Sequence, residues 1–273
     1  MGAALIAATL TGLATGLGTL PFLFVRELPR RVYDGILGLG AGLMLAAATL
    51  GLLAEALAGV RTNGSIQGGT LDGGHLALVI AGFTTGGAIA AAMDRLIPHR
   101  HARGHHQHLG HTPGHDHHDR PSGNADSRRG YAIIGALTIH RVPEGLAIGA
   151  GFAAVEHVHL GLLLAIVVGF QNACEGIVMA APLRKGGVHV GRSAAIITLT
   201  GLATPLAALV GGVLAGHTAP TMPFILALAA GTLIYVTSNE IIPESHSHGF
   251  EGTASSGVVV GFLLTILLKA VLQ

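Results

Sequence analysis

Charged residues are scarce in this sequence. Asp, Glu, Lys and Arg make up 11% of the 273 residues, against about 25% in a typical soluble domain. Hydrophobic residues supply 50% of the chain, and the mean hydropathy is +0.62. The formal net charge of +1 gives no electrostatic basis for binding nucleic acid. The composition therefore predicts an integral membrane protein that contacts the lipid bilayer and has no nucleic-acid partner.

Cysteine and aromatic residues are also scarce. Cys174 is the only cysteine, so an intrachain disulfide framework is excluded. Tryptophan is absent and there are only 3 tyrosines, so no aromatic belt marks the membrane interfaces. The apolar runs are continuous and do not alternate with polar residues, which excludes a transmembrane β-barrel. The expected fold class is an all-α polytopic membrane protein.

Long stretches without charge define the predicted membrane spans. A helix needs about 20 apolar residues to cross the hydrocarbon core. The uncharged run from Ser193 to Asn239 is long enough for two crossings, with a turn at residues 216–223. Eight spans are predicted, in a single transmembrane domain that covers residues 1–273. They occupy residues 2–25, 33–58, 75–97, 130–154, 159–183, 193–215, 222–243 and 253–272.

Glycine, in contrast, is abundant, at 42 residues. In three of the predicted spans two glycines stand four residues apart, and this spacing lets helix backbones approach closely. We expect these glycines to mark close contacts between helices. The pairs are Gly12 and Gly16, Gly82 and Gly86, and Gly257 and Gly261.

The 15 Lys and Arg residues are unevenly distributed over the predicted connections. Three lie between the first and second spans, six flank the connection between the third and fourth, and three lie between the fifth and sixth. Only Arg61 and Lys269 lie on the opposite side. Because basic residues favour the cytoplasmic side of a membrane, we expect both termini to be extracytoplasmic.

The segment of residues 99–129 differs from the rest of the chain. Nine of the 17 histidines lie between His99 and His118, and Gly and Pro are scattered among them without an apolar period. This composition predicts a disordered cytoplasmic loop. Because neutral imidazoles are common ligands of transition metals, the loop is expected to capture metal, with a solvated linker lacking any partner as the alternative. The histidines assigned to metal capture are His105, His106, His108, His111, His115, His117 and His118.

Ionisable residues interrupt the fourth and fifth predicted spans. The fourth contains HRVPEG, in which His140 and Glu144 are four residues apart, and the fifth contains QNACEG, in which Gln171 and Glu175 have the same spacing. Residues four apart share one face of a helix, and spans joined by a short turn are expected to be antiparallel neighbours. The two polar faces should therefore meet in the middle of the membrane.

These groups are costly to bury, at about 2.5–3.5 kcal/mol for a charged residue at the centre of a membrane helix. One imidazole nitrogen, two carboxylates and an amide oxygen would form a suitable shell for a divalent metal ion. Pro143 cannot donate a hydrogen bond to the carbonyl of Ile139, and such a loosened turn is tolerated where it lines protein or a wet cavity. Two alternatives stay open, namely a structural ion pair of Glu144 and Glu175 with Arg141, and a proton relay without metal.

The two motifs resemble the signatures of the ZIP (Zrt/Irt-like protein) family of divalent metal transporters, in particular its bacterial GufA-like branch. HRVPEG is similar to the family signature in the fourth span, and QNACEG to the signature in the fifth. GLGAGLMLAA (38–47), DRLIPHRH (94–101) and SNEIIPESH (238–246) resemble the second span, the exit from the third span and the end of the seventh. The resemblance covers nearly the whole chain.

The resemblance implies a transporter, not an enzyme, that moves divalent metal ions into the cytoplasm. Zinc would be the chief cargo, with Cd²⁺, Fe²⁺ or Mn²⁺ as other candidates, and there would be no organic cofactor. The implied fold has inverted three-helix repeats around the two central spans (3+2+3), in the inner (plasma) membrane of a bacterium. Metal selectivity, proton coupling, a channel or carrier mechanism and a homodimeric state stay open.

The resemblance also assigns residues by position. The transport site between the fourth and fifth spans would consist of Met44, His140, Glu144, Gln171 and Glu175. The release path to the cytoplasm would be lined by Asp34, Asp94, His99, His101, Asn239, Glu240, Glu244 and His246.

Four positions depart from the family pattern. Arg141 stands where the family usually has Asn, and Cys174 where it usually has proline. Asn172 is neutral, and Thr204 stands where relatives with two adjacent metals have an acidic residue. We therefore interpret Arg141 as a fixed substitute for a second cation, with Asn172 and Cys174 tuning the site, and predict a mononuclear transporter. The alternative is that Arg141 only extends to water.

Three other protein classes share single features with this sequence. A cation-diffusion exporter would also have a His-rich loop, but with fewer spans and with paired His/Asp sites that this sequence lacks. A membrane metal sensor or buffering protein would need only the loop, which leaves the charged motifs unexplained. A membrane metalloprotease would need a His-Glu-x-x-His helix, which does not occur in the sequence. The exporter and the sensor are kept as the alternative functions.

Overall fold

The computed structural model describes residues 1–58, 73–96, 123–153, 158–217 and 221–272. Every regular element within these ranges is helical, which confirms the predicted fold class. In chain order the elements are α1 (Gly2–Leu17), the 3-10 helix η1 (Leu20–Leu23), α2 (Arg30–Ala46), the π-helix η2 (Ala47–Leu53), α3 (Ala54–Ala58), α4 (Gly73–Leu96), α5 (Gly123–Ala153), α6 (Val158–Lys185), α7 (Val190–Thr200), α8 (Ala203–His217), α9 (Thr221–Val236), the π-helix η4 (Thr237–Ile241), α10 (Ile242–Ser245) and α11 (Glu251–Leu272).

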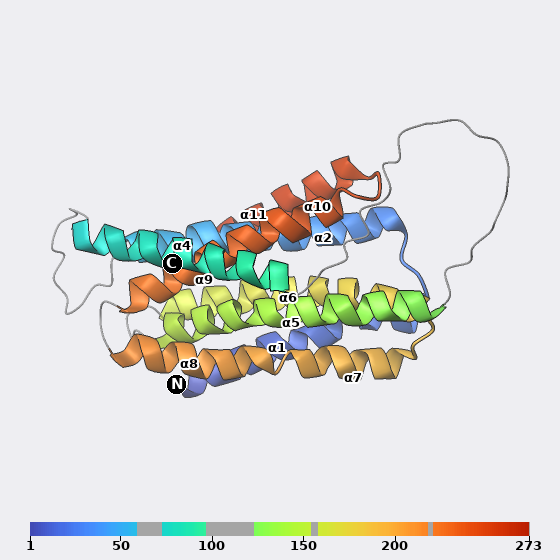
Figure 1. The fold of residues 1–273 in the computed structure, drawn as a ribbon, viewed down its shortest axis with the longest axis horizontal. Coiled ribbons are helices and arrows are strands. Elements are labelled where there is room, and N and C mark those ends of the chain that lie inside the picture. Colours follow the sequence, from blue (N-terminus) through green and yellow to red (C-terminus); the bar gives the residue numbers. More distant parts are fainter. Residues whose placement is uncertain (59–72, 97–122, 154–157, 218–220, 273) are drawn as a thin grey trace.

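Seven helical segments of the described chain are long and apolar enough to cross a membrane. The predicted fourth span corresponds to α5, which contains the ionisable motif and has 31 residues. This length exceeds the roughly 20 residues that a crossing requires. α5 is not among those seven segments by composition, but it lies side by side with α6 in the bundle, and the two ends of the chain lie at the same end of the bundle (Figure 1).

The helices form three layers, with α5 and α6 side by side in the central layer (Figure 1). On one side, α8 packs against α5 and α1 packs against α6. On the other side, α2 packs against α11 and also touches α6, while α4 packs against α9, which touches α5. These contacts of the first three spans therefore have counterparts among the last three, as expected for inverted three-helix repeats around a central pair.

Small residues let the outer helices approach each other closely, as the glycine pairs predicted. A side chain on Gly86 would collide with the backbone of Leu228, where α4 crosses α9. A side chain on Gly257 would collide with the backbone of Gly35, where α11 crosses α2. These contacts join a helix of one repeat to a helix of the other.

Two features of the helices depart from the sequence-based expectation. The sixth span is broken between α7 and α8, because Pro205 has no N–H to donate to the carbonyl of Gly201 and the Gly201 backbone packs against Gly12 of α1. The second and seventh spans each contain a π-helix, η2 and η4. Such segments are rare and often mark functional sites.

The predicted loop between the third and fourth spans is shorter than expected. Because α5 begins at Gly123, residues 123–129 are helical and belong to the fourth span. Residues 97–122, which contain all the histidines assigned to metal capture, lie outside the described residues.

Candidate metal site between helices α5 and α6

The two polar motifs lie on neighbouring helices. Arg141 and Glu144 project from α5, and Gln171 and Glu175 from α6. Arg141, Glu144 and Gln171 are fully shielded from solvent, and Glu175 is 4% exposed. Four polar or charged side chains are therefore buried together at the centre of the bundle. Because burial of charge is costly without partners, their hydrogen bonds determine what the site can do.

The amide group of Gln171 joins the two carboxylates. Its Nε2 donates to Oε1 of Glu144 at 2.6 Å and to Oε1 of Glu175 at 3.0 Å. The polar faces of α5 and α6 thus meet, as the spacing predicted. The expected ligand was the amide oxygen, however, and the structure places the amide nitrogen between the carboxylates. The amide must turn over before Gln171 can offer Oε1 to a cation.

Arg141 points into the site and does not extend to water. Its Nη2 lies 3.3 Å from Oε2 of Glu175, and its side chain is 0% exposed. Arginine stays protonated even in unfavourable surroundings, so it balances one of the two carboxylate charges. Its Nε and Nη1 have no hydrogen-bond partner among the described residues.

Several buried polar atoms of the site lack a partner within the described part of the chain. They include acceptor oxygens and one imidazole nitrogen, whereas buried polar groups are nearly always paired with protein, water or an ion. These atoms are Nδ1 of His140, Oε2 of Glu144, Oε1 of Gln171, Oδ1 of Asn172 and Oγ1 of Thr204. A cation with its water between α5 and α6 would satisfy the first three, which lie on the side chains of the expected ligands.

His140 lies on α5 one turn before Glu144, but its side chain contacts a residue of another helix. Its Nε2 lies 3.5 Å from Oε1 of Glu240, which belongs to η4. Both side chains are mostly buried, at 12% and 11% exposure. The resemblance placed Glu240 on the release path, and the structure places it against one of the expected metal ligands. Nδ1 of His140 is buried and free of partners among the described residues.

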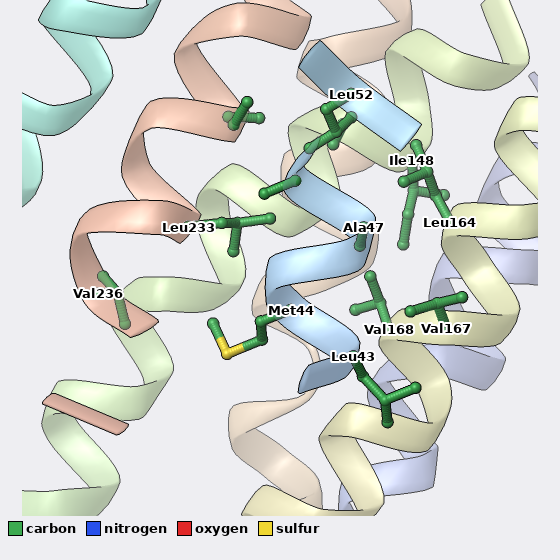
Figure 2. Close-up of a cluster of buried hydrophobic side chains, with 14 of the residues drawn as sticks. Leu43, Met44, Ala47, Leu52, Ile148, Leu164, Val167, Val168, Leu233 and Val236 are labelled. Carbon is green, nitrogen blue, oxygen red and sulfur yellow. The ribbon is translucent and has the colours of Figure 1, made fainter. Parts of the chain in front are cut away.

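Met44 lies in the apolar cluster where α2 meets α6 and α9 (Figure 2). Its thioether points toward the α9 side, near Val236 (Figure 2). The hydroxyl of Thr237 lies 3.5 Å from the Met44 sulfur and 2.7 Å from the carbonyl of Leu233. Met44 therefore has both an apolar environment and a polar neighbour, which fits either an apolar filler or a soft metal ligand.

The expected ligands are not gathered into a ready-made shell. Among the described residues no group of three or more His, Cys, Asp and Glu side chains has a metal-binding arrangement. The cause is visible in the contacts: Gln171 separates the two carboxylates, and His140 faces Glu240. Binding a cation here requires the Gln171 amide to turn over, and His140 can offer only Nδ1 while its Nε2 faces Glu240.

The three residues expected to tune the site have different surroundings. Arg141 pairs with Glu175, as described above. Asn172 is fully buried and donates from Nδ2 to the carbonyl of Thr11 at 3.0 Å, which ties α6 to α1. Cys174 is a partly buried free thiol, and its Cβ lies next to Gly40 of α2, where an added side chain would meet it.

The residues expected on the release path are spread over the end of the bundle that holds α10. Asn239 donates to Oδ2 of Asp94 at 3.0 Å, which connects η4 with α4. Glu244 is partly buried in α10. Asp34 and His246 are engaged with neighbours near the start of α11. His99 and His101 lie outside the described residues.

Two residues that contact the expected site residues were not predicted from the sequence. Thr237 is next to Met44 only because the seventh span folds against the second, and no local spacing reports that contact. His248 forms a 2.8 Å contact with the fully buried Asp34. Its position in the stretch SHSH, two residues after His246, was the available signal.

Comparison with known proteins gives consistent matches over nearly the whole chain. The sequence profile of the family described as "ZIP Zinc transporter" matches residues 1–269. The zinc transporter GufA of Myxococcus xanthus is 38% identical, with 98% of both chains covered. The zinc transporter ZIPB of Bordetella bronchiseptica is 34% identical over 95% of this chain and 78% of its own. The zinc transporter ZupT of Akkermansia muciniphila is 30% identical over 95% and 94%.

Proposed function

The chain belongs to the ZIP zinc transporter family, and we propose that it moves divalent metal ions, chiefly zinc, across the membrane into the cytoplasm. The proposed cargo follows from the zinc transporters that it resembles along its whole length. The proposed sidedness follows from the basic connections, which favour extracytoplasmic termini, and the proposed inward direction is what the resemblance to the family implies. The protein would lie in a bacterial plasma membrane and would carry out no catalysis.

The ion would bind between α5 and α6. The main support is the set of buried acceptor atoms without partners, which lie on the same side chains as the two charged motifs. A dication would bind the carboxylates of Glu144 and Glu175, with the amide oxygen of Gln171 and Nδ1 of His140 as neutral ligands. Met44 would complete the site from α2.

The site would hold one ion at a time. Glu144 and Glu175 bring two negative charges, and Arg141 cancels one of them while it is paired with Glu175. The remaining single negative charge lowers the cost of keeping the empty site in the membrane. A second dication next to the first would have to displace or approach the guanidinium of Arg141, which repels it.

Uptake of radioactive zinc into proteoliposomes tests the transport function. The wild type should accumulate zinc, and Glu144→Gln, which keeps the shape of the side chain, should lower the rate by at least about tenfold because a charged ligand is lost. Glu27→Gln is the matched control, since Glu27 is an exposed carboxylate in the connection between η1 and α2. Equal uptake by all three proteins would contradict the proposal.

The same vesicles separate the alternatives. When the protein is inserted in one known orientation and zinc is supplied on the side of the membrane that holds the termini, zinc should cross to the opposite side. Net movement in the opposite direction under the same gradient conditions would support the exporter alternative. Zinc binding without zinc movement in the wild type would support the sensor or buffering alternative.

A further inference from the structure

Two histidines between α10 and α11 differ in their hydrogen bonding. Nδ1 of His246 lies 2.9 Å from the carbonyl of Ile242, so it must carry the proton and donate it. Nε2 of His246 lies 3.0 Å from the hydroxyl of Ser255, which can donate to its lone pair. Both nitrogens of His246 are therefore occupied, and this ring ties the connection to α11.

His248 is bonded through only one nitrogen. Its Nδ1 lies 2.8 Å from Oδ1 of Asp34 and 3.2 Å from the hydroxyl of Ser247. That hydroxyl donates to the carbonyl of Glu244 at 2.8 Å, so its oxygen can only accept from His248. Both neighbours are thus acceptors, and Nδ1 carries the proton. In the neutral ring the lone pair lies on Nε2, which has no partner among the described residues.

The pairing of His248 with Asp34 is the arrangement that prepares a histidine to bind a metal. Metal-binding histidines usually donate their other ring N–H to a carboxylate, which fixes the ring and increases its basicity. Asp34 is fully buried in α2, and its Oδ2 has no partner among the described residues. The His248 side chain is 24% exposed, so an ion can reach it.

We propose that Nε2 of His248 binds a divalent transition-metal ion at the α10 end of the bundle, with Asp34 as the residue that positions the ring. The site is separate from the HRVPEG and QNACEG motifs on α5 and α6; the resemblance put Asp34 on the release path but gave His248 no role. Water would complete the coordination, because the described residues offer no group of three or more ionisable ligands. Few protein ligands make a weak site, from which an ion can leave readily.

The surroundings carry charges of both signs. A hollow of about 570 Å³ begins at Gly249, the residue after His248, and its lining includes Arg31 and Glu251. Arg31 precedes Asp34 by one helical turn and repels a dication, whereas Glu251 attracts it. The opposing charges allow an ion to be held without tight binding.

The biological role of this site rests on the proposed direction of transport. An ion that leaves the α5–α6 site toward the cytoplasm would reach His248 at the end of the bundle, and His248 would hold it before it enters solution. Binding itself does not depend on that direction, so the two proposals can fail separately.

A tyrosine next to the site provides a local reporter. The ring of Tyr33 meets the ring of His248 edge to face, with 5.7 Å between centroids and 88° between planes. The chain has no tryptophan and only 3 tyrosines. In the double variant Tyr131→Phe/Tyr235→Phe, Tyr33 is therefore the only emitter, and Co²⁺ bound to His248 should quench its fluorescence. Zn²⁺, which does not quench, should displace Co²⁺ and restore the emission.

Three substitutions in this reporter protein make the test specific. His248→Gln should abolish the saturable quenching by Co²⁺, whereas His246→Gln should retain it, because both nitrogens of His246 are already bonded. Asp34→Asn should weaken Co²⁺ binding by about 10–100-fold, the usual effect of losing an orienting carboxylate. Equal quenching in His248→Gln and His246→Gln, or no restoration by Zn²⁺, would overturn the proposal.

A fourth protein separates this site from the transport site. Glu144→Gln in the reporter background should lose transport and keep the Co²⁺ quenching of Tyr33. If the reporter protein failed to transport zinc but showed quenching that depends on His248, the transport proposal would fail and the His248 site would stand. Gel filtration of each variant verifies that the protein remains folded.

Discussion

Arg141 and Glu175 form an ion pair inside the bundle, with 3.3 Å between Nη2 and Oε2 and side-chain exposures of 0% and 5%. A buried pair of this kind is costly to assemble and more costly to break, because removing one partner leaves the other charge uncompensated. Glu175 is also expected to bind the transported ion. We therefore expect Arg141 to influence both the number of ions that the site accepts and the cost of emptying it.

The first prediction concerns stoichiometry. With the loop histidines removed, the wild type should bind one tight ion at the α5–α6 site, measured by equilibrium dialysis with metal analysis. Arg141→Asn removes the repelling cation and should add a second, weaker ion or raise the total occupancy. Arg141→Lys is the control, because it retains a positive charge and should still bind one ion. Two metals bridged by Glu144 and Glu175 in the wild type would end this interpretation.

The second prediction concerns pH. A metal ligand must be deprotonated, so loading the site with metal releases protons. The affinity of the wild type for Cd²⁺, measured by isothermal titration calorimetry, should fall as the pH decreases through the range where imidazole becomes protonated. His140→Gln should show weaker binding and a flatter pH dependence over that range. A pH profile in His140→Gln as steep as that of the wild type would show that His140 is not a ligand.

The third prediction concerns Met44. A thioether is a soft ligand and favours soft ions, so Met44→Ala should reduce Cd²⁺ transport more than Zn²⁺ transport. Met179 is also fully buried but belongs to α6 outside the expected ligand set, and Met179→Ala is the control for loss of packing. Proportionally equal losses for the two metals in Met44→Ala would favour the view that Met44 is an apolar filler of the core.

The fourth prediction separates the His-rich segment from the transport path. Deletion of residues 105–118 removes all seven histidines assigned to metal capture and spares His99 and His101. Zinc uptake into proteoliposomes should persist, with at most a change in rate, because the α5–α6 site remains intact. Loss of all uptake at a normal protein level would place the segment in the transport path.

The helices could be predicted from the sequence because the signals that specify them are local. The uncharged runs predicted where the long helices lie. The spacing of four residues predicted that Gln171 and Glu175 share one face of α6, and Gln171 reaches Glu144 from that face. The close glycine contacts were predictable for the same reason. The π-helices were not, since they depend on how the second and seventh spans pack and where their carbonyls find partners.

The partners of individual side chains could not be predicted in the same way. His140 and Glu144 share a face of α5, yet His140 meets Glu240, which is 100 residues away in the sequence and belongs to another span. The pairing of Asp34 with His248 likewise joins two distant segments. Such contacts arise from the crossing of helices in three dimensions, and a single sequence contains no spacing that reports them.

The last prediction follows from that unexpected contact. Nε2 of His140 faces Glu240, and Nδ1 is buried without a partner among the described residues. If Nδ1 binds the ion, Glu240 holds the ring in the correct orientation, as carboxylates commonly do for metal-binding histidines. Glu240→Ala should then weaken Cd²⁺ binding at the α5–α6 site by about 10–100-fold, measured by isothermal titration calorimetry.

Two further variants distinguish orientation of the ring from the general effect of altering η4. Ser238→Ala changes an exposed side chain of the same π-helix and should leave Cd²⁺ affinity unchanged. Glu240→Gln retains an oxygen that can accept from Nε2–H, so it should recover part of the affinity lost in Glu240→Ala. If Glu240→Ala instead bound Cd²⁺ more tightly than the wild type, Glu240 would be a competitor that holds His140 away from the ion, and the orienting role would be wrong.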